Sequence, residues 1–356
     1  MPPKPPPRHS DFVLRDARDT LASPPRLDPT LPIELPLDLT AGSGAAAQGR
    51  YALRGTLGSG GMGEIALVFD RHIGRDVACK QLRKEARRDD ASRSRFAREA
   101  RIQGQLEHPA VVPVYDLGGS DDGVLFFTMK RVRGTALGEI LSSLASGEST
   151  LSRRYTRRRL LTAFSQVCLA AHYAHERGVV HRDIKPDNIM LGDYGEVYLL
   201  DWGLARVESL DDPTDPAMHA AAGASDGRTR AGQVLGTLGY MAPEQARGEH
   251  ATLDARADVY ALGAILFEIL TCEPLYARDR VELMMARACA GDVDARASVR
   301  APGAEVPPEL EALVVAATAA DRAARLPSAR ALYDALEAYL DGDRNLVERR
   351  AAAARH

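Results

Sequence analysis

The strongest chemical signal in this chain is the segment HRDIKPDN at residues 181–188, followed by DWG, which begins thirteen positions on, at Asp201. The carboxylate of Asp183 can orient a hydroxyl group and accept its proton. Lys185 can neutralise negative charge on a phosphoryl group in transit. Asn188 and Asp201 offer the oxygen ligands that Mg²⁺ prefers. The spacing favours phosphoryl transfer over the structural alternative, a charged loop held together by salt bridges.

A glycine-rich segment, GSGGMG at residues 58–63, fits the pattern G-x-G-x-x-G through Gly58, Gly60 and Gly63. Glycines allow backbone N–H groups to approach phosphate oxygens closely. A dinucleotide site requires a helix after the glycines, whereas the strand-like EIALVFD follows here. No G-K-[ST] follows either, so a Walker loop is excluded. A hairpin that covers phosphates remains, beside a chance match in a glycine-rich turn.

Lys80 lies in the strand-like segment VACK, seventeen residues after Gly63. Only five of the 46 basic residues are lysine, so a lysine here is unusual for this chain. An ammonium group below a glycine-rich hairpin can reach two phosphates, and Glu99 in RFAREARI is the candidate that would hold it in place. The alternative is that Lys80 and Glu99 are ordinary solvent-facing residues.

The surrounding patterns predict a strand-rich lobe followed by a mostly helical one. The expected elements of the first lobe are five strands and one helix, at 51–57, 64–70, 76–82, 111–117 and 124–132, with the helix at 89–107. Apolar residues at helical spacing predict helices at 156–177 and 258–270 and onward to about residue 340. The sequence thus predicts an α+β, bilobal protein, with its ligand site in the cleft between the lobes.

Composition narrows the class of protein. The net charge is -3, apolar residues make up 45% and aromatic residues only 5%, which argues against a nucleic-acid-coating chain. No apolar run is long enough to cross a membrane, and no secretory signal is visible, so we expect a cytoplasmic protein. Residues 1–50 hold ten of the 21 prolines, which indicates a flexible leader or, alternatively, a proline-rich docking tail.

Taken in order, these motifs resemble those of the eukaryotic-type protein kinase family in its bacterial, Hanks-type serine/threonine branch. The resemblance covers about residues 51–340 and implies a kinase-like fold, with an N-lobe at 51–132, a C-lobe at 133–340 and a helical tail at 341–356. It implies ATP with Mg²⁺, or Mn²⁺ as an alternative. Asp183, Lys185, Lys80 and Asn188 would then be catalytic, and Asn188 and Asp201 would hold the metal. The implied ATP-binding residues are Gly58, Gly60, Gly63, Ile65, Ala78, Lys80, Glu99, Met129 and Met190.

The family pattern also suggests regulatory residues. Trp202 stands where phenylalanine is usual, and Arg182 before the catalytic aspartate suggests control by a phosphate on the loop after residue 208, at Thr229 or Ser225. The segment GTLGYMAPE at 236–244 resembles the end of an activation segment. By the family pattern Thr237 would hydrogen-bond Asp183, Glu244 would pair with Arg325, and Asp258 would brace the catalytic loop.

Three functions remain open at this stage. The first is a kinase that acts on serine and threonine in proteins, with autophosphorylation of its activation loop and dimerisation as a route to it. The second is a pseudokinase, although Lys80, Asp183, Asn188 and Asp201 are all present. The third is a kinase of small molecules, against which the intact activation segment argues. The arginine clusters at 83–101 and 153–159 are either solvated helix faces or surfaces for acidic substrates.

Overall fold

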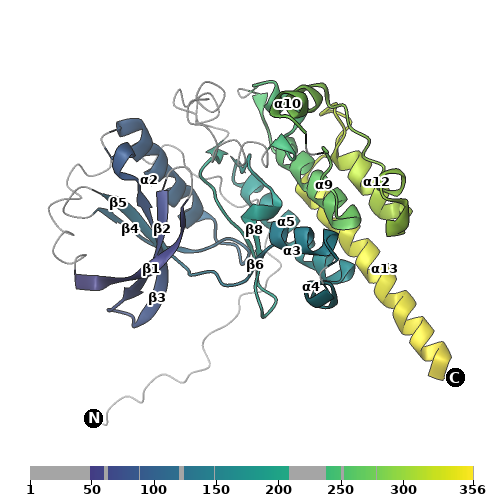
Figure 1. The fold of residues 1–356 in the computed structure, drawn as a ribbon, viewed down its shortest axis with the longest axis horizontal. Helices are drawn as coiled ribbons and strands as arrows, with labels where there is room; N and C mark the ends of the chain where they lie inside the picture. The colour runs from purple at the N-terminus through teal and green to yellow at the C-terminus, as the bar shows by residue number, and fades with distance from the viewer. Residues whose placement is uncertain are drawn as a thin grey trace, which may run out of the picture.

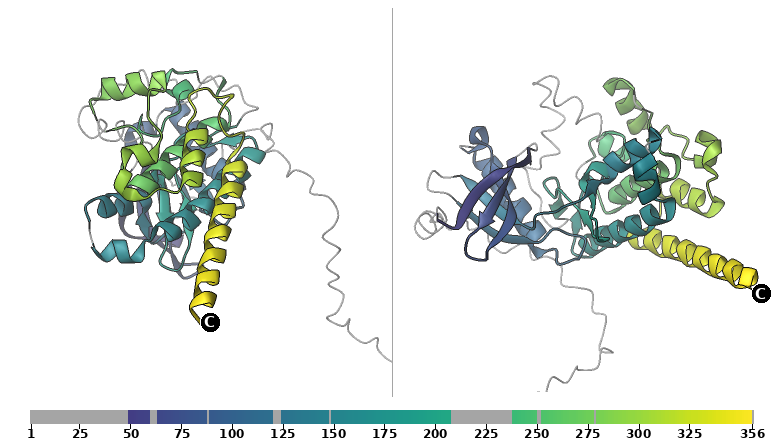
Figure 2. Two further views of the ribbon diagram at one scale, coloured as in Figure 1. Left: turned by 90° about the vertical axis from the view of Figure 1, so that its right-hand side faces the viewer. Right: turned by 60° about the horizontal axis from the view of Figure 1, so that its bottom comes forward.

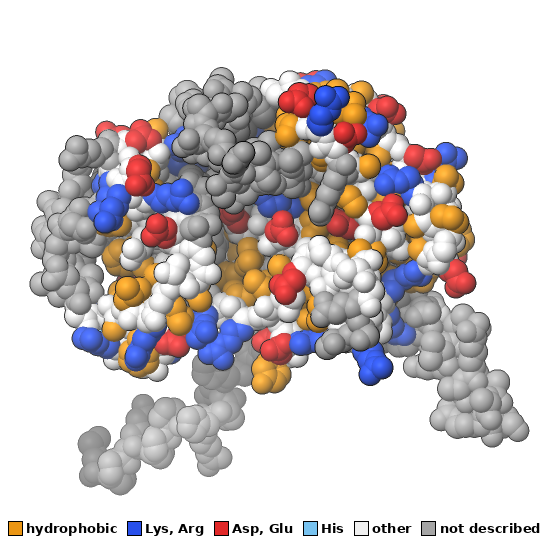
Figure 3. Space-filling model, in the orientation of Figure 1, with side chains coloured by type: hydrophobic (Ala, Val, Ile, Leu, Met, Phe, Trp, Pro, Cys, Tyr) orange, Lys and Arg blue, Asp and Glu red, His pale blue; other side chains and the backbone are white. Residues whose placement is uncertain are grey.

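The computed structural model shows two lobes joined by one connecting segment (Figure 1). It describes residues 49–59, 63–87, 89–119, 124–147, 149–207, 238–249, 252–277 and 279–355. Positive and negative side chains are interspersed over both lobes (Figure 3). The bilobal α+β fold predicted from the sequence is confirmed.

The N-lobe is a five-stranded antiparallel sheet with strand order β1-β2-β3-β5-β4 and a helix, α2. Its elements are β1 (Tyr51–Ser59), β2 (Gly63–Asp70), β3 (Arg75–Leu82), η1 (Lys84–Ala86), α2 (Asp90–Gln105), β4 (Val114–Gly119) and β5 (Leu125–Met129). Helix α2 begins where the Asp89 side chain accepts the backbone N–H of Ser92, a typical N-cap. It packs on the sheet through Phe96, which is fully buried against Phe127.

The C-lobe is built around α9 (Arg256–Thr271). This helix is apolar on every side and almost completely buried, because other helices surround it. The remaining helices are α3 (Leu137–Ala145), α4 (Ser149–Arg154), α5 (Arg157–Glu176), η2 (Pro186–Asn188), α8 (Pro243–Ala246), α10 (Val281–Ala290), α11 (Ala297–Arg300), η4 (Pro302–Ala304), α12 (Pro308–Ala317) and α13 (Ala329–Arg355). The strands are β6 (Thr135–Ala136), β7 (Val179–Val180), β8 (Ile189–Leu191), β9 (Val197–Leu199) and β10 (Arg206–Val207).

Contacts at the back of the molecule fix one lobe to the other. The backbone N–H of Leu199 donates to the carbonyl of Ala110 at 2.8 Å, and Val111 forms an isolated bridge with Leu199. In the connecting segment, the ammonium of Lys130 contacts the hydroxyl of Tyr198 on β9. The segment after α2 is therefore anchored on the C-lobe, whereas the sheet reaches the C-lobe through fewer links.

The helix α13 runs without interruption from Ala329 to Arg355 and extends well beyond the lobe (Figure 2). Its continuation past Leu340 is rich in alanine and arginine, both strong helix formers. The strand expected at 111–117 begins only at Val114, because Pro113 supplies no N–H for the ladder. Among the described residues, no helix has the length and apolar character needed to span a membrane.

Candidate active site

Asp183, Lys185 and Asn188 form one hydrogen-bonded group in the loop before β8. The Lys185 ammonium lies 2.8 Å from Asp183 Oδ2. The amide of Asn188 donates to Asp183 Oδ2 at 3.1 Å and to its carbonyl at 2.8 Å. Among the described residues, Asp183 Oδ1 is buried without a hydrogen-bond partner. One carboxylate oxygen is thus held by the protein, and the other is left for a substrate group.

The pKa of Asp183 is raised by burial, which disfavours the ionised form; nearby Asp201 acts in the same direction. Lys185 opposes the shift by stabilising the carboxylate. A carboxylate with a raised pKa is a stronger proton acceptor than an exposed aspartate, so the environment suits Asp183 to act as a base.

A buried carboxylate on α9 holds the backbone of this loop. Asp258 accepts the N–H of His181 through Oδ2 and the N–H of Arg182 through Oδ1, both at 2.8 Å. Its Oδ2 also lies 2.8 Å from His175 Nε2. Burial raises the pKa of Asp258, but the hydrogen bonds and charge of its partners outweigh this and lower it overall. Asp258 therefore stays ionised and fixes the loop from below.

Two residues of the site have left-handed backbone conformations that are uncommon outside glycine. Arg182 has φ 68° and Asp201 has φ 60°. Such backbone is retained where the surroundings enforce it, here by Asp258 below Arg182. The Leu200 N–H donates to the Asn188 carbonyl at 2.7 Å, which brings the two loops that carry Asn188 and Asp201 together.

Lys80 on β3 faces the same region from the N-lobe. Its ammonium forms an ion pair with Glu99 of α2 and lies 3.8 Å from Oδ1 of Asp201. Burial disfavours the ammonium, but the carboxylates of Glu99 and Asp201 outweigh it and raise the pKa of Lys80. Lys80 is thus a fixed positive charge. The Asp201 side chain is 53% exposed.

Gly63, the last glycine of the pattern, begins β2 and lies against β3 close to Lys80. A Cβ on Gly63 would meet the Gln81 carbonyl oxygen at 2.6 Å and Lys80 Cγ at 3.4 Å, so only glycine fits there. Gly58 pairs with Ile65 across β1 and β2, and its missing side chain would face open space. Gly60 lies outside the described residues.

The residues expected around adenine come from four strands, β2, β3, β5 and β8. Ile65 pairs with Lys80 between β2 and β3, and Ala78 pairs with Met129 between β3 and β5. Met190 lies on β8 in the C-lobe. Ala78 is buried, and the other three side chains are half-buried.

Trp202, which follows Asp201, is buried in the C-lobe core. Its ring centroid lies 4.5 Å from that of His181, and its indole N–H donates to the Leu199 carbonyl at 3.3 Å. Because the indole N–H has a hydrogen-bond acceptor, the large ring can be buried there without leaving a polar group unsatisfied.

Glu244 and Arg325 form a buried ion pair that joins α8 to the segment before α13. The guanidinium makes two contacts with the carboxylate, at 2.7 and 3.0 Å. Burial raises the pKa of Glu244, but the hydrogen bonds and charge of Arg325 outweigh it, so the pKa is lowered. Thr229, Ser225 and Thr237 lie outside the described residues.

The donor set fits a magnesium ion shared with phosphates. Among the described residues, no three His, Cys, Asp or Glu side chains gather as a metal site of their own. Asn188 and Asp201 would supply only two of about six oxygen ligands, which leaves room for phosphate oxygens and water, the usual pattern for Mg²⁺. The Asp201 side chain is half exposed, so its carboxylate is accessible to a ligand.

Sequence reasoning missed three residues that support the site. His175 contacts Asp258, Gln245 donates to the Arg182 carbonyl at 2.7 Å, and Lys130 links the connecting segment to Tyr198. For His175, the only signal in the sequence is that it stands six residues before His181. The roles of Gln245 and Lys130 depend on contacts with residues more than sixty positions away.

Comparisons with known proteins agree with this geometry. The family model described as "Protein kinase domain" matches residues 51–335. The serine/threonine-protein kinase PknD of Chlamydia trachomatis serovar D is 36% identical over 304 residues, 83% of this chain and 32% of the relative. PknD of Chlamydia caviae is 35% identical over 298 residues, 82% of this chain and 31% of the relative. The chain therefore spans about a third of the length of these relatives.

A solved structure is also similar. The crystal structure of the Mycobacterium tuberculosis PknI kinase domain has 26% sequence identity and a TM-score of 0.56. The match covers 81% of this chain and 96% of that chain. The two-lobed arrangement is thus shared over nearly the whole of that domain.

Proposed function

This chain belongs to the protein kinase family, and from that premise we propose that it transfers the γ-phosphoryl group of ATP to serine and threonine hydroxyls of proteins. Members of the family use ATP with Mg²⁺. The curated relatives are named serine/threonine-protein kinases, which supports the choice of acceptor. Because ATP is the donor, we expect the domain to work in the cytoplasm.

One observation carries this proposal: groups from both lobes converge on one place. Lys80 of the N-lobe lies 3.8 Å from Asp201 of the C-lobe, and Asp201 in turn affects the pKa of Asp183 electrostatically. A positive charge, a metal-ligand oxygen and a base are thus near enough to act on a single terminal phosphate. Phosphoryl transfer requires this arrangement, because catalysis here is mainly positioning and charge stabilisation.

The chain's own residues divide the work as follows. Lys80, held by Glu99, binds phosphate oxygens of ATP, while the backbone of the glycine-rich turn covers them. Asp183 Oδ1 accepts a hydrogen bond from the acceptor hydroxyl and then takes its proton. The hydroxyl oxygen forms a new bond to the γ-phosphorus as the bond to the β–γ bridging oxygen breaks, and ADP leaves. Lys185 stabilises the charge on the transferred group.

Asn188 and Asp201 would hold Mg²⁺, which when bound neutralises phosphate charge; Mn²⁺ is the alternative ion. The side-chain amide nitrogen of Asn188 donates to Asp183, so its side-chain oxygen, Oδ1, is the atom that would face a metal.

The regulatory assignment is part of the same proposal. Arg182 and a phosphate on Thr229 or Ser225 would pair in the active state, and Trp202 would hold the Asp201 loop inward from its buried position. Thr237 would contact Asp183, and Glu244 with Arg325 would anchor the end of the activation segment. Autophosphorylation between two copies of the chain is the proposed route to activation.

The test is transfer of labelled phosphate from ATP to the protein itself and to added protein acceptors, followed by phosphoamino-acid analysis. We expect Mg²⁺-dependent labelling of serine and threonine, lost in Asp183→Asn and Lys80→Met. Nucleotide binding without transfer in the wild type would identify a pseudokinase, and labelling of small molecules alone would identify the third candidate function. Either result would overturn the proposal.

A further inference from the structure

Two adjacent side chains of the connecting segment, residues 130–134, contact opposite lobes. The Lys130 ammonium donates to the hydroxyl of Tyr198 on β9 and lies 4.9 Å from the centre of its ring. The Arg131 guanidinium lies 3.2 Å from a carboxylate oxygen of Asp76 on β3. The backbone N–H of Lys130 also donates to the Pro113 carbonyl, at 3.1 Å. The connecting segment is therefore held from both lobes at two consecutive residues.

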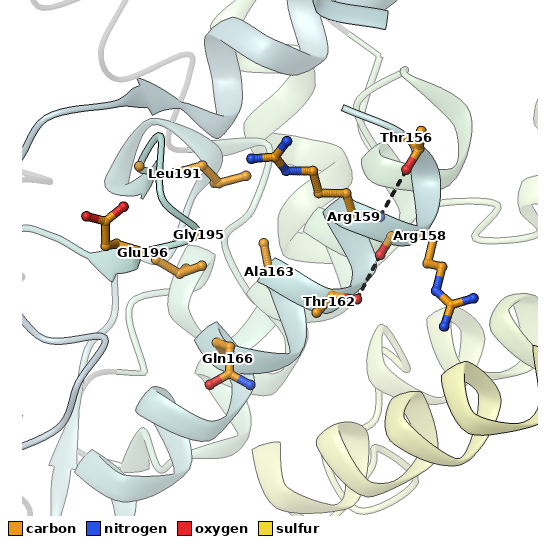
Figure 4. A pocket seen from close by; sticks show the side chains of 11 residues that line it. Thr156, Arg158, Arg159, Thr162, Ala163, Gln166, Leu191, Gly195 and Glu196 are labelled. Carbon is orange, nitrogen blue, oxygen red and sulfur yellow. Dashed lines mark hydrogen bonds between the residues drawn. The ribbon is translucent and has the colours of Figure 1, made fainter. Parts of the chain in front are cut away.

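Tyr198 lies on the face of β8 and β9 that is turned away from the C-lobe core. Leu191 and Val197 belong to that core, and they also line a groove beside α5 (Figure 4). Because successive side chains of a strand point to opposite faces, Met190 and Tyr198 face the other way, and they pair directly across β8 and β9. The Lys130 contact therefore reaches the position beside Met190, which is expected next to adenine.

Arg131 makes the corresponding link on the side of the N-lobe. Its partner Asp76 stands two residues before Ala78 on β3, and Ala78 pairs with Met129 of β5. Ala78 and Met129 are the residues expected on the N-lobe side of adenine. The Arg131 and Asp76 side chains are 27% and 35% exposed, so this pair should contribute less than the contact with the buried tyrosine of β9.

The Lys130 ammonium keeps its charge in this position. The hydrogen bond to Tyr198 raises the pKa of Lys130 and outweighs burial, which acts in the opposite direction. The carboxylate of Glu196, near the start of β9, adds a smaller contribution that also raises it. A hydrogen bond from a charged donor is stronger than one between neutral groups, so the contact can hold the backbone of the segment in place.

We propose that Lys130 and Arg131 are positioning residues of the nucleotide site, which hold the connecting segment at the distance from β3 and β8 that accepts the purine ring of ATP. The inference rests on the proposed function, because it takes adenine as the group between Ala78 and Met190. Both contacts exist in the free protein and keep it in the arrangement that binds. Their loss lowers the apparent affinity in proportion to the fraction of molecules that remain competent.

Equilibrium binding of ATP and of adenosine to the full chain tests the proposal. Lys130→Met should weaken both ligands by about fivefold, because both carry the base, and Arg131→Met should weaken both by about twofold. Arg133→Met is the matched control: it removes an exposed basic side chain of the same segment and should leave both affinities unchanged. Lys80→Met is the opposite control and should weaken ATP alone, because Lys80 acts on the phosphates.

A double-mutant cycle assigns the effect to the contact itself. Tyr198→Phe removes the hydroxyl but keeps the ring, and it should weaken both ligands by about threefold. Combined with Lys130→Met, it should add no further loss, whereas additive losses would contradict the assigned contact. In steady-state assays of Lys130→Met, the KM for ATP should rise while kcat stays within about twofold of the wild type, a split that a general loss of structure would not produce.

The outcomes separate this inference from the proposed function. Equal affinity for adenosine in the wild type and in Lys130→Met would overturn the positioning role alone, and phosphoryl transfer by the wild type would stand. A loss of ATP affinity in Lys130→Met without any loss for adenosine would also overturn it, because the effect would then lie at the phosphates. A wild-type chain that binds no ATP would overturn the proposed function and this inference with it.

Discussion

The two halves of the active site are held by different means. In the C-lobe, Asp258 fixes the catalytic loop through two backbone N–H groups, and Asn188 is tied both to Asp183 and to Leu200. In the N-lobe, Lys80 is positioned by one side-chain ion pair with Glu99. Backbone contacts leave a loop little freedom, whereas a single pair between long side chains is only as fixed as the helix that carries it.

The position of Lys80 therefore depends on α2, the helix that carries Glu99. Any shift of this helix moves Glu99 away from Lys80, while the Asp183 group keeps its geometry. A signal that acts on α2 would therefore change activity without unfolding the protein. The following predictions separate the two halves, from the largest expected effect to the smallest.

Replacing the base should have the largest effect. Asp183→Asn removes the proton acceptor but keeps the hydrogen bond from Asn188, so we expect transfer to fall by about 10³-fold. The affinity for ATP should remain within about twofold of the wild type, because Asp183 faces the acceptor and not the adenosine. Single-turnover transfer and equilibrium nucleotide binding measure the two quantities. Retained transfer would show that another group accepts the proton.

Breaking the buried ion pair of the C-lobe should cost stability. Arg325→Met leaves the Glu244 carboxylate buried without its partner, so we expect the free energy of unfolding to fall by about 3 kcal/mol at pH 7. Chemical denaturation measures it. The matched control Arg330→Met removes an exposed pair with Asp334 and should change stability little.

The stability that Arg325→Met loses relative to the wild type should depend on pH. The pKa of Glu244 is lowered in the folded protein, so its contribution is complete above the ordinary value of 4.5 and is lost as the pH falls through the lowered value. In Arg325→Met, the hydrogen bonds and charge of Arg325 no longer lower the pKa of Glu244, so burial, the largest influence, favours its neutral form. The stability gap between wild type and variant should therefore begin to narrow above pH 4.5, where the buried Glu244 of the folded variant takes up a proton, and should narrow further as the pH falls through the lowered wild-type value. A constant gap would argue against the ion pair as its cause.

Releasing the N-lobe half should reduce activity more than stability. Glu99→Gln removes the charge that holds Lys80, so we expect kcat/KM to fall by about 30-fold. Lys80 keeps the Asp201 carboxylate at 3.8 Å as a counter-charge, so the unfolding midpoint should fall by less than in Arg325→Met. Glu85→Gln, on the exposed turn before α2, is the matched control and should keep full activity. A large loss of stability in Glu99→Gln would contradict the division between the two halves.

The smallest effect should be a displacement of the pH profile. Activity requires ionised Asp183, so it falls as the pH drops through a pKa that burial has raised and Lys185 partly lowered. Lys185→Met removes the lowering charge, and the acid limb of kcat/KM should move to higher pH by less than about one unit. The exposed Lys84→Met should leave the limb in place.

The sequence predicted those parts of the molecule that depend on local pattern. The alternating segments gave the N-lobe strands, and the helix expected at 89–107 spans Asp90–Gln105. Asp183, Lys185 and Asn188 lie within six consecutive residues, so their proximity required only that the loop fold back on itself. Lys80 and Glu99 followed from strand and helix order.

What escaped prediction depends on contacts between distant segments. Nothing in the sequence near Arg182 indicates its left-handed backbone, which follows from the hydrogen bonds to Asp258, 76 residues away. The contact of Lys130 with Tyr198 and the groove beside α5 arise only when β9 packs behind the connecting segment. Such features are properties of the packed chain and leave no local pattern.

The central claim is that Lys80 and Asp201 meet one metal-bound nucleotide across the lobes. The most direct test is the affinity for ATP with and without Mg²⁺ for the wild type, Asp201→Ala and Lys80→Met. We predict that Mg²⁺ strengthens binding to the wild type, that Asp201→Ala loses this dependence, and that Lys80→Met binds more weakly. Unchanged Mg²⁺-dependent affinity in Asp201→Ala would contradict the account.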